Sequence, residues 1–286
     1  GLQPGDGGSA ALTVNRGTET VGYMKDYAKF FLGDNTTVNG TVTNTVSNIS
    51  LYTLQTPYAY FSIGSNNNFS ASSSFVNSGS YLFVAVEVQG GGNNFSGAFT
   101  NSASLSVNPG PDAARNVFEN LVNKGSGEVT FAQSGNASVN INNQAKLTVT
   151  DTSDGIQFTG LTNSGTASIL ADVKFLEADF GSGAVSNTGT LTINGTLESE
   201  LSLSNTGTAT IAGPDSVIKG NITNSGTFNF RSNAEVTGVV NNSGTLNVDA
   251  GASGMVFATL LNAASGTVQL NAQATLNNVT NSGSLT

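Results

Sequence analysis

The acidic residues that could take part in catalysis lie in the second half of the chain. Cleavage of a glycosidic bond needs two carboxyl groups facing each other, one acting as acid and the other as base or nucleophile. The candidates are Asp172, Glu177 and Asp179 with Lys174; Glu198 with Glu200; and Asp151 with Asp154. None of these spacings recurs along the chain, which favours solvated loop charges over a catalytic site. We therefore expect no catalytic residues and predict that the protein is not an enzyme.

Metal and nucleophile chemistry is restricted by the residue types that the chain lacks. The sequence contains no Cys and no His, which removes disulfides, thiolate metal sites, the commonest general base and the commonest zinc ligand. Residues 5–8 (Gly-Asp-Gly-Gly) and 151–154 (Asp-Thr-Ser-Asp) suggest calcium, but neither has the tandem Gly-Gly-x-Gly-x-Asp pattern of calcium-binding rolls. We expect no metal ion and no cofactor.

Threonines separated by one residue indicate another kind of function, because a flat array of hydroxyl groups can bind ice. The pairs are Thr148 and Thr150, Thr190 and Thr192, and Thr208 and Thr210. Such an array needs a regular lattice, and in later repeats Asn229, Asn247 and Gln269 replace the second threonine. We interpret the pairs as ordinary threonines on the surface of β-strands, where this residue type is common.

The composition excludes several classes of partner. Only 9% of the 286 residues are charged, against roughly a quarter in an ordinary soluble domain. The formal net charge of −9 is spread thinly and leaves no basic patch for a nucleic acid. No apolar run reaches the roughly 18–20 residues that span a bilayer, and the N-terminus lacks the features of a signal peptide. We expect a mature, soluble chain, extracellular or on a cell surface, without nucleic-acid binding or membrane insertion.

One recurring phrase organises the sequence and is clearest over residues 236–248. Two short alternating runs, with Val236 and Val240 in the first and Leu246 and Val248 in the second, are joined by Asn-Ser-Gly-Thr, whose residues favour turns. The Gly of this corner, or the Ala that replaces it, recurs every 17 to 24 residues at Gly79, Ala103, Gly127, Ala145, Gly165, Gly189, Gly207, Gly226, Gly244, Gly266 and Gly283. Such an interval suits one coil of a parallel β-solenoid, with three short strands and three turns.

We therefore predict an all-β protein, a parallel and right-handed β-solenoid with about 18–24 residues per coil. It is expected to span residues 37–286, with irregular, aromatic-rich coils to about residue 100 and regular coils after that point. Alternation predicts inward-pointing apolar pairs: Leu191 with Ile193, Phe228 with Phe230, and Leu246 with Val248. Thr192, Asn229 and Asn247 are expected to point outward.

The corners are the residues expected to control how the coils stack. They are Asn163, Gly165, Asn187, Gly189, Asn205, Gly207, Asn224, Gly226, Asn242, Gly244, Gly266 and Gly283. The Asn side chains are expected to form an amide ladder along the axis, each bonding its counterpart about 4.8 Å away, with either Asn241 or Asn242 in the column. The glycines are expected to permit the backbone twist at the corner.

Three stretches fit the repeat less well. Residues 1–36 are predicted to cap the first coil or to dock another subunit. Within them, a short helix closed by Gly33 is favoured by six residues at helical spacings, Val21, Met24, Tyr27, Ala28, Phe31 and Leu32. The aromatic residues also allow a strand over residues 27–32. The stretch around Pro57 is rich in aromatic residues, namely Tyr52, Tyr58, Tyr60 and Phe61. We interpret it as irregular coils, and the alternative is a surface that binds sugars or a partner subunit. Residues 111–122 resemble a helix start, but the repeat register predicts another coil there.

Four corner phrases carry a resemblance to a known family. Residues 162–166 read Thr-Asn-Ser-Gly-Thr, residues 186–190 read Ser-Asn-Thr-Gly-Thr, and residues 224–228 and 242–246 begin Asn-Ser-Gly-Thr. These phrases resemble the degenerate coil repeats of bacterial autotransporter passengers and filamentous-haemagglutinin-like adhesins. The resemblance covers most of the chain beyond about residue 38. It implies secretion, a right-handed parallel β-helix and a role at a cell surface.

The two ends of the repeat array predict self-assembly. End coils of a solenoid expose unpaired backbone and apolar columns, and the sequence stops within a corner phrase at residues 281–286. Two explanations are open: the chain is cut from a longer solenoid, or its last coil docks onto the first coil of another copy. The residues expected to dock onto another copy are Leu12, Val14, Leu276, Val279 and Leu285. We expect a noncatalytic, secreted structural protein that assembles head to tail into an extracellular or cell-surface filament. The alternatives are a monomeric adhesin stalk that binds host or surface glycans, and a polysaccharide-degrading β-helix enzyme.

Overall fold

A computed structural model of the chain describes residues 12–16, 28–46, 59–79, 84–110, 113–132, 137–150, 156–176 and 183–286. The chain divides into two compact units, a first unit of residues 1–141 with 145–147 and a second unit of residues 142–144 with 148–286. The described residues contain strands and no helix, and the parallel strands stack as a β-solenoid of about 10 turns. The predicted fold class is confirmed.

The strands are short, and most of them alternate buried and exposed residues. In the first unit they are β1 (Leu12–Arg16), β2 (Ala28–Leu32), β3 (Thr37–Val38), β4 (Thr41–Val46), β5 (Ala59–Ile63), β6 (Asn68–Phe69), β7 (Ser74–Ser78), β8 (Val84–Val88), β9 (Asn94–Asn101), β10 (Ser104–Val107), β11 (Asn116–Asn123) and β12 (Glu128–Phe131). The residues of β13 (Ala137–Asn143) and β14 (Lys146–Val149) are divided between the units. In the second unit the strands are β15 (Ile156–Asn163), β16 (Thr166–Ile169), β17 (Val173–Phe175), β18 (Val185–Asn187), β19 (Thr190–Ile193), β20 (Leu197–Ser199), β21 (Leu203–Asn205), β22 (Thr208–Ile211), β23 (Ser216–Ile218), β24 (Ile222–Asn224), β25 (Thr227–Phe230), β26 (Ala234–Asn242), β27 (Thr245–Val248), β28 (Met255–Asn262), β29 (Thr267–Leu270), β30 (Ala274–Asn281) and β31 (Ser284–Leu285).

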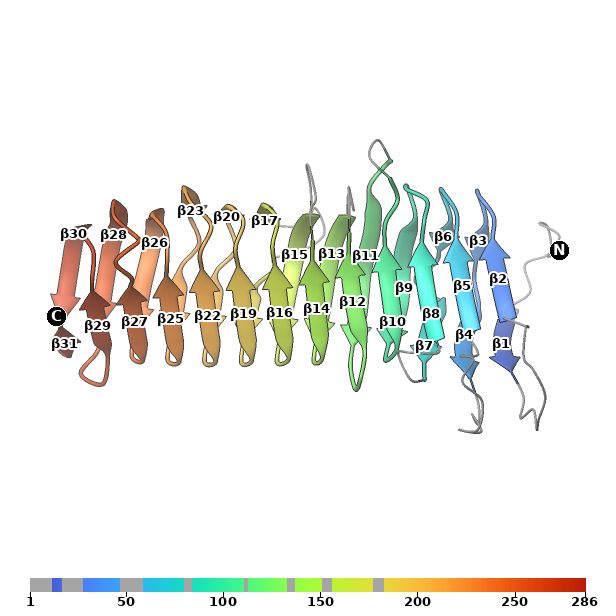
Figure 1. Cartoon of the computed structure of the whole chain (residues 1–286), viewed down its shortest axis with the longest axis horizontal. Helices are drawn as coiled ribbons and strands as arrows, with labels where there is room; N and C mark the ends of the chain where they lie inside the picture. Colours follow the sequence, from blue (N-terminus) through green and yellow to red (C-terminus); the bar gives the residue numbers. More distant parts are fainter. Residues whose placement is uncertain are drawn as a thin grey trace. The chain divides into compact units, whose positions relative to one another are not determined.

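Each regular coil of the second unit contains three strands separated by turns. One coil consists of β16, β17 and β18, and the next consists of β19, β20 and β21. These strands pair in parallel, β16 with β19, β17 with β20 and β18 with β21, so each strand lies over its counterpart one coil away. Figure 1 shows β16, β19, β22, β25, β27 and β29 side by side along one face of this unit. Strand β26 takes the place of two separate strands, because it pairs with both β23 and β24 of the preceding coil. Its pairing with β28 contains a register shift between Val236 and Val239.

Alternation along each strand builds the core of the second unit. The inward residues that the sequence predicts are all fully buried: Leu191, Ile193, Phe228, Phe230, Leu246 and Val248. The predicted outward residues Thr192, Asn229 and Asn247 are partly exposed. Because the strands are in register, Phe228 lies over Leu246 and Leu246 over Val268, and buried apolar columns run from coil to coil. Burial of this apolar surface is the main favourable contribution to the stability of the stack.

In the first unit, stacked phenylalanine rings fill the core. Phe69, Phe95 and Phe118 form a column with ring centroids 4.6 and 4.5 Å apart, and the rings of Phe75 and Phe99 stack at 4.6 Å. These separations are close to the distance of about 4.7–4.9 Å between neighbouring strands. In each column, the aromatic ring of one coil therefore packs on the ring of the coil before it.

The preferred helix at the N-terminal side is wrong for the residues that the structure describes there. Residues 28–32 form strand β2, which pairs in parallel with β5, and the rings of Phe30 and Phe61 lie 4.7 Å apart. Pairing with the next coil and the strand preference of aromatic residues outweigh the helical spacing. Residues 17–27 lie outside the described part of the chain. Strand β1 pairs with β4, so both described strands before residue 36 belong to the stack.

Two further sequence interpretations concern irregular regions. The coil expected over residues 111–122 is confirmed from residue 116 onward, where β11 pairs in parallel with β9. In the aromatic stretch Phe61 is fully buried in the core, whereas Tyr60 is partly exposed and its hydroxyl accepts a hydrogen bond from Gln89 at 3.3 Å. Tyr52, Pro57 and Tyr58 lie outside the described residues. Among the residues that are described, no helix is long and apolar enough to cross a membrane.

Candidate functional site

A buried ladder of asparagine amides runs through the corners of the second unit. Each Asn occupies the last position of a strand, where alternation turns its side chain inward. The amide Nδ2 of each residue donates to the Oδ1 of the next at 2.7–2.8 Å, in the order Asn143, Asn163, Asn187, Asn205, Asn224, Asn242, Asn262 and Asn281. The predicted amide ladder is confirmed, and Asn242, not Asn241, is the member of the column.

Each amide in the regular part of the ladder has a full set of partners. The Nδ2 of Asn205 donates to Oδ1 of Asn224 at 2.8 Å, to the carbonyl of Gly207 at 3.1 Å and to the carbonyl of Thr227 at 2.9 Å. Its Oδ1 accepts from Asn187 at 2.7 Å. Two N–H groups are thus shared among three acceptors, one in the same corner and two on the next coil. The side chain both closes the corner and joins neighbouring coils, which makes it costly to remove.

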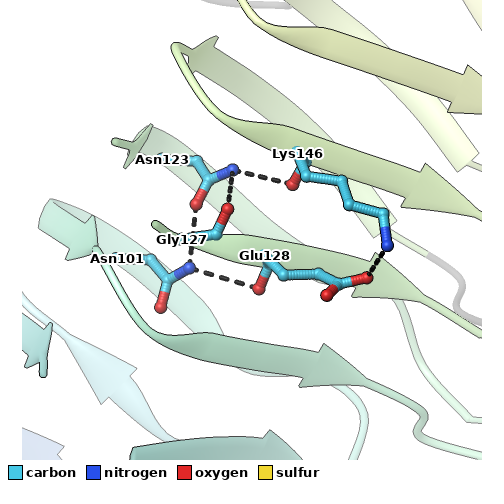
Figure 2. Close-up of polar contacts among 5 residues, drawn as sticks. All are labelled: Asn101, Asn123, Gly127, Glu128 and Lys146. Atoms are coloured by element: carbon cyan, nitrogen blue, oxygen red, sulfur yellow. Dashed lines mark hydrogen bonds and ion pairs between the residues drawn. The ribbon is translucent and has the colours of Figure 1, made fainter. Parts of the chain in front are cut away.

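The first unit has a ladder of the same kind, which the sequence interpretation recognised only in part. Here Nδ2 to Oδ1 bonds of 2.9, 2.7 and 2.9 Å join Asn44 to Asn77, Asn77 to Asn101, and Asn101 to Asn123. Figure 2 shows the end of this series, where Asn123 also donates to the carbonyls of Gly127 at 3.3 Å and Lys146 at 2.8 Å. Asn77, Asn101, Asn143, Asn262 and Asn281 were not predicted as corner residues. The missed signal is an Asn two or four residues before each Gly or Ala marker.

The corner glycines are required for a reason different from the predicted one. None of Gly165, Gly189, Gly207, Gly226 and Gly244 has a φ in the left-handed region. Instead, a Cβ atom added at Gly207 would overlap the carbonyl oxygen of Gly189, and one added at Gly226 would overlap the carbonyl oxygen of Gly207. Both distances would be far below 3.0 Å, a contact that Cβ atoms in proteins essentially never show. Backbone twist is therefore the wrong explanation at these five corners. Glycine is needed because successive corners approach each other too closely for a side chain.

The candidate catalytic residues form ion pairs and a backbone contact. Lys174 and Glu198 are register partners on adjacent coils and lie 3.2 Å apart, and Lys219 lies 3.8 Å from Glu198 and 3.3 Å from Glu200. The structure thus joins two groups that looked separate in the sequence. The Asp172 carboxylate accepts a hydrogen bond from the backbone N–H of Thr196 at 2.7 Å. Four further candidates lie outside the described residues: Asp151, Asp154, Glu177 and Asp179.

Replacing Lys219 with Ala is expected to change the free energy of unfolding by less than about 1 kcal/mol, because ion pairs between exposed side chains are screened by water. The side chain of Lys219 is 51% exposed, and those of Glu198 and Glu200 are 40% and 45% exposed. Urea unfolding followed by circular dichroism at low and high salt would measure the effect. A loss of several kcal/mol that persists at high salt would contradict this interpretation.

The predicted docking residues on the C-terminal side lie in the last described coil, in β30 and β31. Val279 and Leu285 are 41% and 38% exposed, although their register partners on the preceding coil, Leu260 and Val268, are fully buried. Leu276, the partner of Phe257, is partly exposed. These three residues continue the inward columns and therefore present apolar surface along the axis. On the N-terminal side, Leu12 and Val14 lie in β1, in register with Val42 and Asn44. Docking itself stays a prediction.

The described part of the chain contains no cluster of three or more acidic residues that could hold a metal ion. The two calcium candidates, residues 5–8 and 151–154, lie outside it. Comparison of the chain with protein-family models, curated proteins and solved structures yields no match.

Proposed function

We propose that this chain is a noncatalytic structural protein, a subunit of an extracellular or cell-surface filament in which β-solenoids stack head to tail. One observation carries the proposal. Every described coil of the second unit pairs in parallel with the one before it, and its apolar columns are covered by the columns of the next coil. Because each coil packs against the next by the same parallel strand pairing and apolar contacts, a coil of this unit is suited to pack against a coil of another copy.

The proposed contact combines strand pairing with apolar burial. In the final coil, β30 and β31 pair backward with β28 and β29, and their other edges can add further strands. In the first coil, β1 and β2 pair forward with β4 and β5 in the same parallel sense. Docking of β30 on β1 would bring Leu276 and Val279 against the strand that holds Leu12 and Val14. A head-to-tail contact of this kind does not close on itself and therefore generates a filament.

The amide ladder places a limit on this contact. Asn281 at the final coil is a member of the ladder, but β1 has Val14 at the corresponding register position, beside Asn44. The ladder would therefore not continue across a junction between copies. We expect each junction to be weaker than a boundary between coils within the chain, so that the filament dissociates before its subunits unfold.

Several features support a structural role outside the cell. The low charge and the lack of Cys and His suit a protein exposed to proteases and oxidants, and the corner phrases resemble those of secreted passengers and adhesins. Among the candidate catalytic residues, Glu198 and Glu200 share a lysine partner and Asp172 holds a backbone N–H. These contacts favour a structural use of the carboxylates. A screen for glycan degradation tests the enzyme alternative, since activity that is lost on changing Asp172 or Asp179 would overturn the noncatalytic proposal.

Replacing Val279 with Lys is expected to stop filament growth, because Val279 continues an inward apolar column and the variant would bury an unpaired charge in the contact between copies. Negative-stain electron microscopy and sedimentation of the purified chain would show filaments for the wild type. For the variant, the concentration needed for assembly should rise by at least about tenfold. Circular dichroism would establish that the variant is folded.

Thr280 provides a matched control on the same strand. Its side chain is exposed and its register partner is Leu261, on the outward side of β28. The Thr280→Lys variant adds the same charge outside the proposed contact and should assemble like the wild type. Equal loss of assembly in both variants would contradict head-to-tail docking. A wild-type chain that stays monomeric at all concentrations would reject the filament in favour of a monomeric stalk, for which glycan binding is the next test.

A further inference from the structure

One face of the second unit carries an unbroken column of hydroxyl groups. The column occupies the first position of β16, β19, β22, β25, β27, β29 and β31, which pair in parallel without a register shift. Its members are Thr166, Thr190, Thr208, Thr227, Thr245, Thr267 and Ser284, all of them exposed or partly exposed. Figure 1 shows these strands side by side along the unit. We call this surface the hydroxyl face.

A second column beside the first contains only hydroxyl and amide side chains. Two positions along each strand, the register aligns Ser168, Thr192, Thr210, Asn229, Asn247 and Gln269. The amides that interrupt the threonines are held in line, because Asn247 donates to Asn229 at 2.8 Å and Asn229 donates to the hydroxyl of Thr210 at 3.3 Å. Thr210 is buried, whereas Asn229 and Asn247 are partly exposed and Gln269 is exposed, so the amides extend the polar surface of the face on their own coils. Neither column contains a charged or an aromatic residue.

The composition and shape of the hydroxyl face exclude several partners. Another face of the same unit holds the charged side chains of Lys174, Glu198 and Lys219, so the lack of charge is local to the hydroxyl face. The nearest charges along two of its strands, Arg231 and Asp249, follow β25 and β27 and pair with each other at 3.5 Å. Small-molecule sites are usually concave and largely apolar, and contacts with aromatic groups need aromatic or cationic side chains. A periodic array of hydroxyls is better suited to a partner that is itself periodic and bonds only through O–H groups.

The spacing of the column is close to one spacing in tetrahedrally ordered water. Neighbouring parallel strands place successive threonines about 4.8 Å apart. Water molecules joined by O–H···O bonds of about 2.75 Å at tetrahedral angles have second neighbours about 4.5 Å apart. The difference of about 0.3 Å per coil adds up along the column, so the match stays within the ordinary range of O–H···O distances over two or three neighbouring threonines only. A short row of threonines can therefore take the place of a short row of second-neighbour water molecules.

We propose that the hydroxyl face binds ice. The branched threonine side chains are stiff at χ1, so their hydroxyl groups need little further ordering when an ordered water layer forms on them. Sequence alone favoured ordinary surface threonines because Asn and Gln interrupt the second column. The register shows that the first column is complete. The inference does not depend on filament formation, since it uses a lateral face and not the ends of the stack.

Incorporation of the purified chain into a slowly growing ice hemisphere tests this inference. The wild type should be enriched in the ice fraction, whereas the Thr208→Tyr variant should be enriched at least about tenfold less, because a bulky ring within the column keeps an ordered water layer away from the neighbouring hydroxyls. Thr237→Tyr is the matched control, since Thr237 is also an exposed threonine on a strand of this unit but lies in β26, away from the hydroxyl face. Tyrosine is favourable in strands, so both variants should fold.

A second variant separates the hydroxyl groups from the shape of the face. Thr190→Val combined with Thr208→Val keeps the branched side chains but removes two neighbouring hydroxyls, and should lower incorporation into ice less than Thr208→Tyr does. Exclusion of the wild type from ice would overturn the proposal. Equal loss in Thr208→Tyr and Thr237→Tyr would also overturn it, as would binding to crystalline cellulose or chitin together with exclusion from ice.

Discussion

Replacing Asn242 with Ala should destabilise the second unit by about 3–5 kcal/mol, since buried partners are left without hydrogen bonds. The Nδ2 of Asn242 donates to Oδ1 of Asn262 at 2.8 Å and to the carbonyls of Gly244 and Thr267 at 3.1 Å, and its Oδ1 accepts from Asn224 at 2.8 Å. All of these groups lose a partner at once. Urea unfolding followed by circular dichroism would measure the loss.

The neighbouring residue supplies the control for this prediction. Asn241 belongs to the same strand, but its side chain is exposed on the outward side between Thr223 and Leu261. Asn241→Ala should therefore change stability by less than about 0.5 kcal/mol. Similar losses in the two variants would show that the ladder contributes nothing beyond local strand propensity.

A carboxylate at the same position should make stability depend on pH. In Asn242→Asp, one oxygen can accept from Asn224, but the other faces the three oxygens that Nδ2 of Asn242 now serves. Repulsion and burial raise the pKa of the introduced carboxyl above its unfolded value, because they disfavour the ionised form. The variant should then be most stable at acidic pH and lose stability between about pH 4 and pH 7, relative to the wild type. A flat difference over this range would argue against a buried amide at this position.

The second large effect is expected at the glycine column. Gly226→Ala should destabilise the second unit by about 2–4 kcal/mol, because the added Cβ overlaps the backbone carbonyl of Gly207 and backbone cannot rotate away as a side chain can. Gly244→Val should cost at least as much, since its Cβ meets the carbonyl of Gly226. Thermal unfolding followed by circular dichroism would report both losses.

Two further variants separate crowding from backbone conformation. Asn tolerates the left-handed region better than most residues, so Gly226→Asn would be mild if a twisted backbone were the requirement, and should be severe if crowding is. Gly33→Ala is the control for adding a methyl group, because its Cβ would meet only the ring of Phe31 at 3.9 Å. This variant should lie within about 0.5–1 kcal/mol of the wild type. A mild Gly226→Asn would restore the backbone explanation.

The local repeat determined most of the fold. Alternation of apolar and polar residues is a property of neighbours in the chain, and it was sufficient to place Leu191, Phe228 and Leu246 in the core. The recurrence of the corner phrase was likewise sufficient to predict a parallel solenoid and the amide ladder through Asn187, Asn205 and Asn224. Alternation and the corner phrase both depend on residues that are close together in the chain, so they can be recognised from the sequence alone.

Contacts between coils needed the tertiary structure, because their partners lie about one coil apart in the sequence and the length of the intervening loops sets the register. Only the register shows that Asn242 and not Asn241 joins the ladder, and that Lys174 pairs with Glu198. The glycine requirement is also of this kind, since the atom that excludes a side chain at Gly226 belongs to the previous coil. So is the hydroxyl column, whose threonines occupy separate phrases in the sequence and become one surface only when the coils stack.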